Sequence, residues 1–215
     1  GLLGRDHPLD LGANAALPAV RELAASADVI LAIGTELGET DYDVVFDDGF
    51  HLNGTLIRID LDPEQLARNQ RTTLGLVGDA GRSLELLLEH FSAPLKRQGA
   101  ERTAAALNAL DLANDPAFRD FVPLYAALAD HLPEAILVGD STAPVYAGNH
   151  LVSQPAPRRY FNASTGYGTL GYGLPAALGA QLARPDLPVV ALVGDGGVMF
   201  TLSELATAVE ARLPV

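Results

Sequence analysis

The 215-residue chain contains no cysteine, so disulfides, thiolate metal sites and thiol catalysis are all excluded. Basic residues are also few: 14 Lys and Arg stand against 27 Asp and Glu, which gives a formal net charge of −13. So acidic a chain repels phosphate backbones and anionic lipid, and neither nucleic acid nor a membrane is an expected partner. No signal-peptide pattern and no apolar run long enough to span a bilayer appear either. These absences favour a cytoplasmic protein.

Short apolar runs that predict strands alternate with helical patterns along the chain. Hydrophobic residues make up 48% of the sequence and charged residues 19%, which suits a globular protein with a buried core. Five runs predict strands, at residues 28–33, 55–60, 74–77, 135–138 and 189–193. Strands that alternate with helices predict an α/β fold, so we expect two Rossmann-like domains, each a parallel sheet with helices on both faces.

A polar stretch in the middle of the chain marks the expected domain boundary. Pro94 and Gly99 flank basic residues typical of a solvated connection, and residues 101–113 suit an exposed helix. We therefore expect one domain over residues 1–92, a linker over 93–115 and a second domain over 116–215.

The motif Gly-Asp-Gly-Gly at residues 194–197 follows directly on the strand expected at 189–193. Its glycines permit backbone conformations closed to other residues, and such a turn lets backbone N–H groups approach a phosphate. A carboxylate in the same turn repels phosphate. Asp195 is therefore explained as a ligand of a hard divalent cation, Mg²⁺ or Ca²⁺, that bridges the protein and a diphosphate. Thr201 and Glu204 then match a capping box, which predicts a further helix.

Together with the glycine-rich segment 166–180, this motif resembles the cofactor-binding domain of the thiamine diphosphate enzymes, most of all the acetolactate synthase and 2-oxo acid decarboxylase group. An acidic glycine turn alone is common, and it is the two segments in this order that carry the resemblance. The first half is similar to the central domain of the same enzymes through the phrases at residues 6–8 and 59–63. The resemblance implies a thiamine diphosphate- and Mg²⁺-dependent lyase or transferase that acts on a 2-oxo acid.

The resemblance also implies roles for particular residues. Asp195 is the metal ligand, and two catalytic positions are implied: the Leu170 side chain wedges beneath the bent cofactor, and the Gly168 carbonyl accepts from its 4′-amino group. The implied cofactor-binding residues are Ser141, Thr142, Gly168, Thr169, Leu170, Gly194, Gly196 and Gly197. A place in the core is the alternative for Leu170, and a helix cap is the equal alternative for Ser141 and Thr142.

Other polar residues are explained better by structure than by catalysis. His7, Asp60 and Asp62 form a tempting catalytic set, but their positions are those of turn and cap residues. His131 and His150 are expected at helix ends, without a catalytic duty.

Some relatives of this group carry FAD in the central domain, usually with an arginine in the phrase that corresponds to residues 34–40. Here Glu36 and Glu39 place negative charge where a cofactor phosphate would lie, so FAD is not expected. This departure favours a 2-oxo acid decarboxylase over an acetolactate synthase. A Rossmann dehydrogenase is a further reading, weakened because no complete Gly-x-Gly-x-x-Gly follows a strand. A non-catalytic remnant that binds only diphosphate or a partner subunit is another alternative.

The sequence has no initiator Met and stops at residues 213–215, where another buried strand is expected to start. In the family, the catalytic glutamate belongs to an N-terminal domain of a neighbouring subunit, and an asparagine beyond the next strand completes the metal site. The resemblance thus implies a homodimer or homotetramer. We expect these 215 residues to be a fragment, inactive alone, with both domains incomplete.

Overall fold

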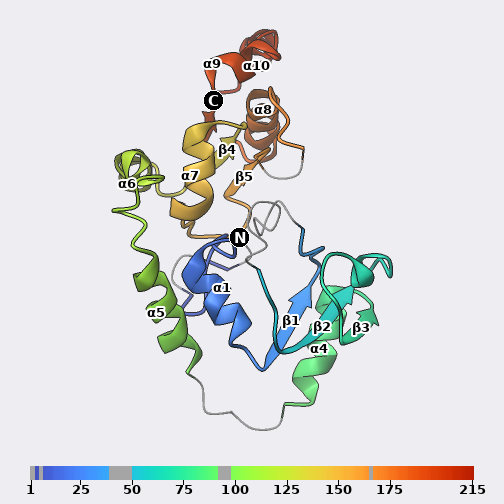
Figure 1. Ribbon diagram of the computed structural model, residues 1–215. Helices are drawn as coiled ribbons and strands as arrows, with labels where there is room; N and C mark the ends of the chain where they lie inside the picture. The colour runs from blue at the N-terminus through green and yellow to red at the C-terminus, as the bar shows by residue number, and fades with distance from the viewer. Residues whose placement is uncertain (1–2, 5–6, 39–49, 92–97, 165–166) are drawn as a thin grey trace. The chain divides into compact units, whose positions relative to one another are not determined.

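The computed structural model describes residues 3–4, 7–38, 50–91, 98–164 and 167–215, coloured along the chain in Figure 1. The chain forms two compact units, one of residues Ala15–Leu110 and one of Gly1–Asn14 with Asp111–Val215. Each unit contains a three-stranded, wholly parallel sheet accompanied by helices. The predicted α/β class with two parallel sheets is therefore confirmed.

The sheet of the unit Ala15–Leu110 has the order β1-β2-β3. Its strands are β1 (Val29–Ile33), β2 (Thr55–Asp60) and β3 (Leu74–Val77), each within one residue of the expected run. The accompanying helices are α1 (Pro18–Ala25), the short 3₁₀ turn η1 (Gln65–Ala67), α4 (Ala80–Glu89) and α5 (Gly99–Leu110). Asp79 caps α4 as expected, because its Oδ1 accepts from the Arg82 N–H at 2.8 Å.

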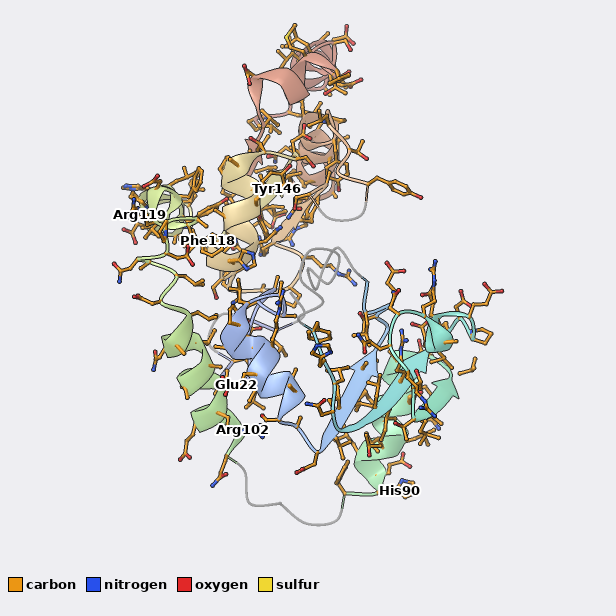
Figure 2. All side chains as sticks on the ribbon, in the orientation of Figure 1. Glu22, His90, Arg102, Phe118, Arg119 and Tyr146 are labelled. Atoms are coloured by element: carbon orange, nitrogen blue, oxygen red, sulfur yellow. The ribbon has the colours of Figure 1, made fainter. Side chains whose placement is uncertain are left out.

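Helix α5 lies beside α1 in the same unit, and Figure 2 labels Arg102 and Glu22 on these neighbouring helices. Thr103 and Ala106 of α5 are buried, and Arg102 donates to the Ser26 Oγ at 3.4 Å. The sequence led us to expect an exposed helix inside a linker over 93–115. An alanine-rich helix shows little apolar periodicity, so its packed face could not be recognised. The compact units consequently divide after residues 14 and 110, not at the expected residues 92 and 115.

The second unit has the sheet order β5-β4-β6. Its strands are β4 (Ile136–Gly139), β5 (Tyr160–Asn162) and β6 (Val189–Leu192). The helical elements are η2 (Arg119–Phe121), α6 (Val122–His131), α7 (Ala143–Leu151), α8 (Gly173–Ala183), α9 (Asp195–Met199) and α10 (Glu204–Ala211). Every residue of the central strand β4 is buried.

Helices cover both faces of this second sheet. Ile136 and Val138 of β4 pack with Ala177 of α8 on one face. Leu137, which points the other way, packs with Tyr125 of α6 and with the partly buried Leu151 of α7. Two covered faces explain why β4 reads as a continuous apolar run and not as an alternating one.

Two tyrosine hydroxyls hold the first turn of α7. Tyr125 donates to the Pro144 carbonyl, and Tyr160 donates to the Val145 carbonyl at 2.9 Å. Burial raises the pKa of Tyr125 to about 12 and raises the pKa of Tyr160 as well. Gly148 lies against both hydroxyls and leaves the room they occupy. The start of α7 is thereby fixed against the sheet.

No helix in the described ranges combines the length and the apolar character needed to cross a membrane.

Candidate cofactor site at the carboxyl ends of β4 and β6

Two neighbouring parallel strands end at the same edge of the second sheet, with Gly139 of β4 opposite Leu192 of β6. Ligands of open α/β sheets bind at this edge, because the loops that leave the strands there diverge. Asp140, Ser141 and Thr142 follow β4 in sequence, and each approaches a glycine of one of two other loops. Those segments are residues 167–171 and 194–197, which carry the predicted site; they are called the two glycine loops below, although the second forms the start of α9.

Ser141 and Thr142 lie against these two glycine loops. A Cβ added to Gly168 would lie 3.5 Å from the Ser141 Oγ, and one added to Gly194 would lie 3.3 Å from the Thr142 Oγ1. Thr142 occupies the N-cap position of α7, but its side chain makes no capping hydrogen bond. Ser141 donates to the Ala163 carbonyl at 3.2 Å. Helix capping, the alternative from sequence, therefore does not account for either hydroxyl.

The loop that contains Gly168, Thr169 and Leu170 presents its side chains outward. Gly168 has a φ of +59°, a left-handed conformation that favours glycine. Thr169 is exposed, and 48% of Leu170 is accessible to solvent. Leu170 is therefore not a core residue of this unit, which removes the structural alternative raised by the sequence.

The Gly-Asp-Gly-Gly motif forms the start of α9 directly. Gly194 is its N-cap with a φ of −83°, and the other three residues are helical, so the motif does not use the backbone conformations that its glycines permit. The motif uses glycine for space instead. A Cβ on Gly196 would meet nothing within 4 Å, whereas a Cβ on Gly197 would lie 2.9 Å from the Asp140 Oδ2. Asp195, at the first helical position, is exposed.

The expected capping box at Thr201 and Glu204 is also wrong. Ser203 is the N-cap of α10 and makes no side-chain cap bond. The Thr201 hydroxyl turns away from the helix and donates to the Gly171 carbonyl at 3.1 Å. Thr201 thus bonds a carbonyl thirty residues away in sequence and not a backbone group of the nearby helix.

The donor set fits a diphosphate with a hard cation. The N–H groups in the first turn of a helix have no acceptor within that helix, so those of α9 can donate to a phosphate. The exposed Asp195 carboxylate in the same turn can bind a cation, and the space at Gly196 is open. Across the described ranges, no three His, Cys, Asp or Glu side chains come together as a metal site.

Asp140 is the residue of this site that sequence reasoning missed. It is fully buried, and its two carboxyl oxygens accept from two backbone N–H groups, that of Ser141 and that of Gly171, each at 2.8 Å. The available signal was an acidic residue placed directly after a wholly apolar strand.

Three of the polar residues interpreted as structural have local partners. His7, Asp60 and Asp62 each accept a backbone N–H two residues further on, which is a turn contact. His131 ends α6, and His150 lies in the last turn of α7 with its Nδ1 2.9 Å from the Asn14 Oδ1.

The centre of the His150 ring lies 4.8 Å from the centre of the Phe118 ring. Phe118, which precedes η2 and α6 in the sequence, is labelled in Figure 2. Burial lowers the pKa of His150, an effect that the Asp115 carboxylate opposes. A lowered pKa keeps the His150 ring neutral near pH 7.

The loop after β1 contains Glu36, a residue on which the question of FAD binding was argued from the sequence. The buried Arg58 donates to the carbonyls of Thr35 and Arg68, each at 2.7 Å, and so fixes this loop. The Glu36 carboxylate lies 3.3 Å from the Arg68 guanidinium, with both side chains about half exposed. Such an exposed pair adds little stability, but it keeps a carboxylate at the loop. Glu39 lies outside the described residues.

Two family matches cover most of the chain. Residues 1–87 match the central domain of thiamine pyrophosphate enzymes, and residues 139–215 match the C-terminal TPP-binding domain of the same enzymes. The chain belongs to the thiamine pyrophosphate enzymes. The whole site described above lies within the second match.

Known relatives refine this assignment. The chain is 38% identical over 215 residues to the probable 2-ketoarginine decarboxylase AruI of Pseudomonas aeruginosa, covering 98% of this chain and 37% of that protein. It is 31% identical over 198 residues to the acetolactate synthase large subunit of Parasynechococcus marenigrum, covering 87% and 31%. It is 29% identical over 203 residues to the acetolactate synthase isozyme 3 large subunit of Escherichia coli, covering 88% and 34%. The chain thus spans about a third of the length of these relatives.

Proposed function

We propose that the full-length protein is a thiamine diphosphate- and Mg²⁺-dependent enzyme that decarboxylates a 2-oxo acid, a carbon–carbon lyase. The observation that carries this proposal is the convergence of residues 140–142 on the two glycine loops, at the carboxyl ends of adjacent parallel strands. The similarity to a protein named as a decarboxylase supports the reaction. Thiamine diphosphate supplies the electron sink for loss of CO₂.

Each site residue has a proposed task toward the cofactor. The exposed Asp195 carboxylate holds Mg²⁺, which anchors the diphosphate and does not polarise the reacting carbonyl. The exposed Leu170 side chain would support the cofactor, and the Gly168 carbonyl would accept a hydrogen bond from its amino group. The diphosphate would be bound by hydroxyl and backbone N–H groups of Thr142, Thr169, Gly194, Gly196 and Gly197, and by the Ser141 hydroxyl once it leaves the Ala163 carbonyl.

Carboligation of the acetolactate synthase type is the second candidate, because two of the relatives compared carry that name. The two reactions differ in the fate of the fragment left after CO₂ loss. A decarboxylase releases it as an aldehyde, whereas a synthase joins it to a second 2-oxo acid. Product analysis therefore separates them.

The test is CO₂ release by the full-length protein from straight-chain, branched, aromatic and guanidinium-bearing 2-oxo acids, 2-ketoarginine included. We expect release that requires both thiamine diphosphate and Mg²⁺ and that forms one aldehyde per CO₂. Acetolactate from pyruvate would replace this proposal by the synthase. Cofactor binding without turnover on any member of the panel would leave a non-catalytic diphosphate-binding protein.

We also propose a homodimer or homotetramer. The support is the resemblance to enzymes in which the catalytic glutamate comes from a neighbouring subunit, so that a complete site needs at least two chains. Light scattering of the full-length protein tests this, and a monomer at micromolar concentration would contradict it.

The purified full-length protein should be colourless, without the visible absorption of bound FAD. The reason is that the Glu36 carboxylate engages the Arg68 guanidinium at 3.3 Å, so that, among the described residues, the loop after β1 offers a cofactor phosphate no unpaired arginine at this place. The measurement is the absorption spectrum of the native protein and of the supernatant after denaturation. Stoichiometric release of flavin would contradict this expectation and would favour the acetolactate synthase alternative.

A further inference from the structure

We infer that Asp140 and Thr201 are positioning residues, which fix the backbone at Gly171 and thereby place the Leu170 side chain for the cofactor. This inference rests on the function proposed above. It assigns a task to two residues that belong to neither the diphosphate-binding nor the metal-binding set.

The backbone is held on both sides of the Gly171 Cα. The N–H that follows Leu170 donates to the Asp140 Oδ2 at 2.8 Å, and the Gly171 carbonyl accepts from the Thr201 Oγ1 at 3.1 Å. Gly171 has a φ of +83°, which side-chain-bearing residues rarely adopt. An added Cβ would lie 2.9 Å from the Phe200 Cβ and 3.4 Å from the Gly197 carbonyl oxygen. The loop is thus tied to the segment that follows α9.

The two aspartates of the site have different surroundings. Asp140 is 0% exposed, and its other oxygen already accepts from the Ser141 N–H. Gly173 and Gly197 approach it so closely that an added Cβ would lie 3.2 Å from the Asp140 Cβ or 2.9 Å from its Oδ2. Asp195, by contrast, is exposed. Asp140 therefore organises the loops, and Asp195 is the one that offers oxygens to a cation.

Leu170 needs such support because its side chain has little to pack against. It is 48% exposed and belongs to none of the core clusters of the described residues. Side-chain packing defines the position of a half-exposed leucine only in part, so the neighbouring backbone must define the rest. The hydrogen bonds of Asp140 and Thr201 supply that definition.

The test uses nearly isosteric variants of the full-length protein. Asp140→Asn keeps the size but turns one acceptor oxygen into an NH₂ group that faces a backbone N–H. Thr201→Val keeps the shape and removes the hydroxyl, and Thr201→Ser is the matched variant that keeps it. Loss of one hydrogen-bond partner in a buried site changes an equilibrium constant, such as that for cofactor binding, by about tenfold.

Two measurements follow. Without cofactor, amide hydrogen exchange at Gly171 should be about tenfold faster in Asp140→Asn when the new NH₂ group faces the Gly171 N–H, which then loses its acceptor. Faster exchange at Ser141 instead would mean that the amide is turned the other way, and the Thr201 variants then carry the test. Calorimetric affinity for thiamine diphosphate at saturating Mg²⁺ should fall by about tenfold in Asp140→Asn and Thr201→Val, and Thr201→Ser should restore most of it. If Asp140→Asn does not fold, the Val and Ser variants of Thr201 still decide.

The decisive comparison is made in a Leu170→Ala background. If Asp140 and Thr201 act by placing the Leu170 side chain, they have almost no side chain to place once Leu170 is alanine. Asp140→Asn and Thr201→Val should therefore lose most of their effect on affinity in this background. Equal effects in both backgrounds, or variants that bind as tightly as wild type, would overturn the inference. Wild-type protein that binds no thiamine diphosphate would instead overturn the proposed function, and the inferred role with it.

Discussion

Replacing Asp195 by asparagine in the full-length protein should weaken Mg²⁺-dependent binding of thiamine diphosphate by at least about a hundredfold. Loss of an outer-shell partner already costs metal sites about 10- to 100-fold in affinity, and Asp195 is proposed as a direct ligand. The carboxylate is exposed at the first position of α9, and no cluster of three His, Cys, Asp or Glu lies in the described ranges to replace it. An amide oxygen carries no charge, so the attraction for a hard cation falls sharply.

The measurement is calorimetric titration of thiamine diphosphate with and without Mg²⁺. Asp186→Asn is the matched control: it makes the same change at an exposed aspartate of the same unit, paired with Arg184 at 2.7 Å. The hydrogen bond from Arg184 lowers the pKa of Asp186 to about 2, so it is ionised at neutral pH as a comparable charge. The control should bind as wild type does. Unchanged affinity in Asp195→Asn would refute the metal assignment.

The strands were predictable from sequence wherever they form continuous apolar runs. Five of the six strands in the described ranges fall within one residue of the runs that predicted them, because strands of parallel sheets are typically apolar on both faces. The sixth, β5, was missed. It is only three residues long, all partly buried, and it exists because Tyr160 and Phe161 pair with Leu137 and Val138 of β4. Pairing partners more than twenty residues away leave no local pattern.

In the candidate site too, residues with local sequence patterns were predictable and residues with distant partners were not. The two glycine loops could be recognised because each carries its motif in adjacent residues. Asp140 and Thr201 could not, because their partner at Gly171 is about thirty residues away from each of them. Thr201 was even misleading, since its spacing to Glu204 matches a local capping box that the fold does not use. Short motifs thus reveal what binds a ligand more readily than what holds the binding groups in place.

Replacing Gly148 by alanine should lower the free energy of opening of α7 by about 3 kcal/mol or more. A Cβ at this position would lie 2.6 Å from the Tyr160 hydroxyl and inside van der Waals contact of the Tyr125 hydroxyl. Overpacking of this kind costs about 1–3 kcal/mol. Both hydroxyls would also be pushed off the Pro144 and Val145 carbonyls, at about 1 kcal/mol for each hydrogen bond.

Native-state hydrogen exchange of α7 in the full-length protein measures this free energy. Gly179→Ala is the control within a helix, since its Cβ meets nothing within 4 Å, and alanine there should stabilise α8 by about 0.5–1 kcal/mol. Adding Tyr125→Phe to Gly148→Ala removes one of the two clashing hydroxyls. The double variant should therefore cost less than the sum of the single changes, as expected for residues in contact. Strict additivity, or an α7 as stable in Gly148→Ala as in wild type, would show that the tyrosine hydroxyls do not hold the start of α7 through Gly148.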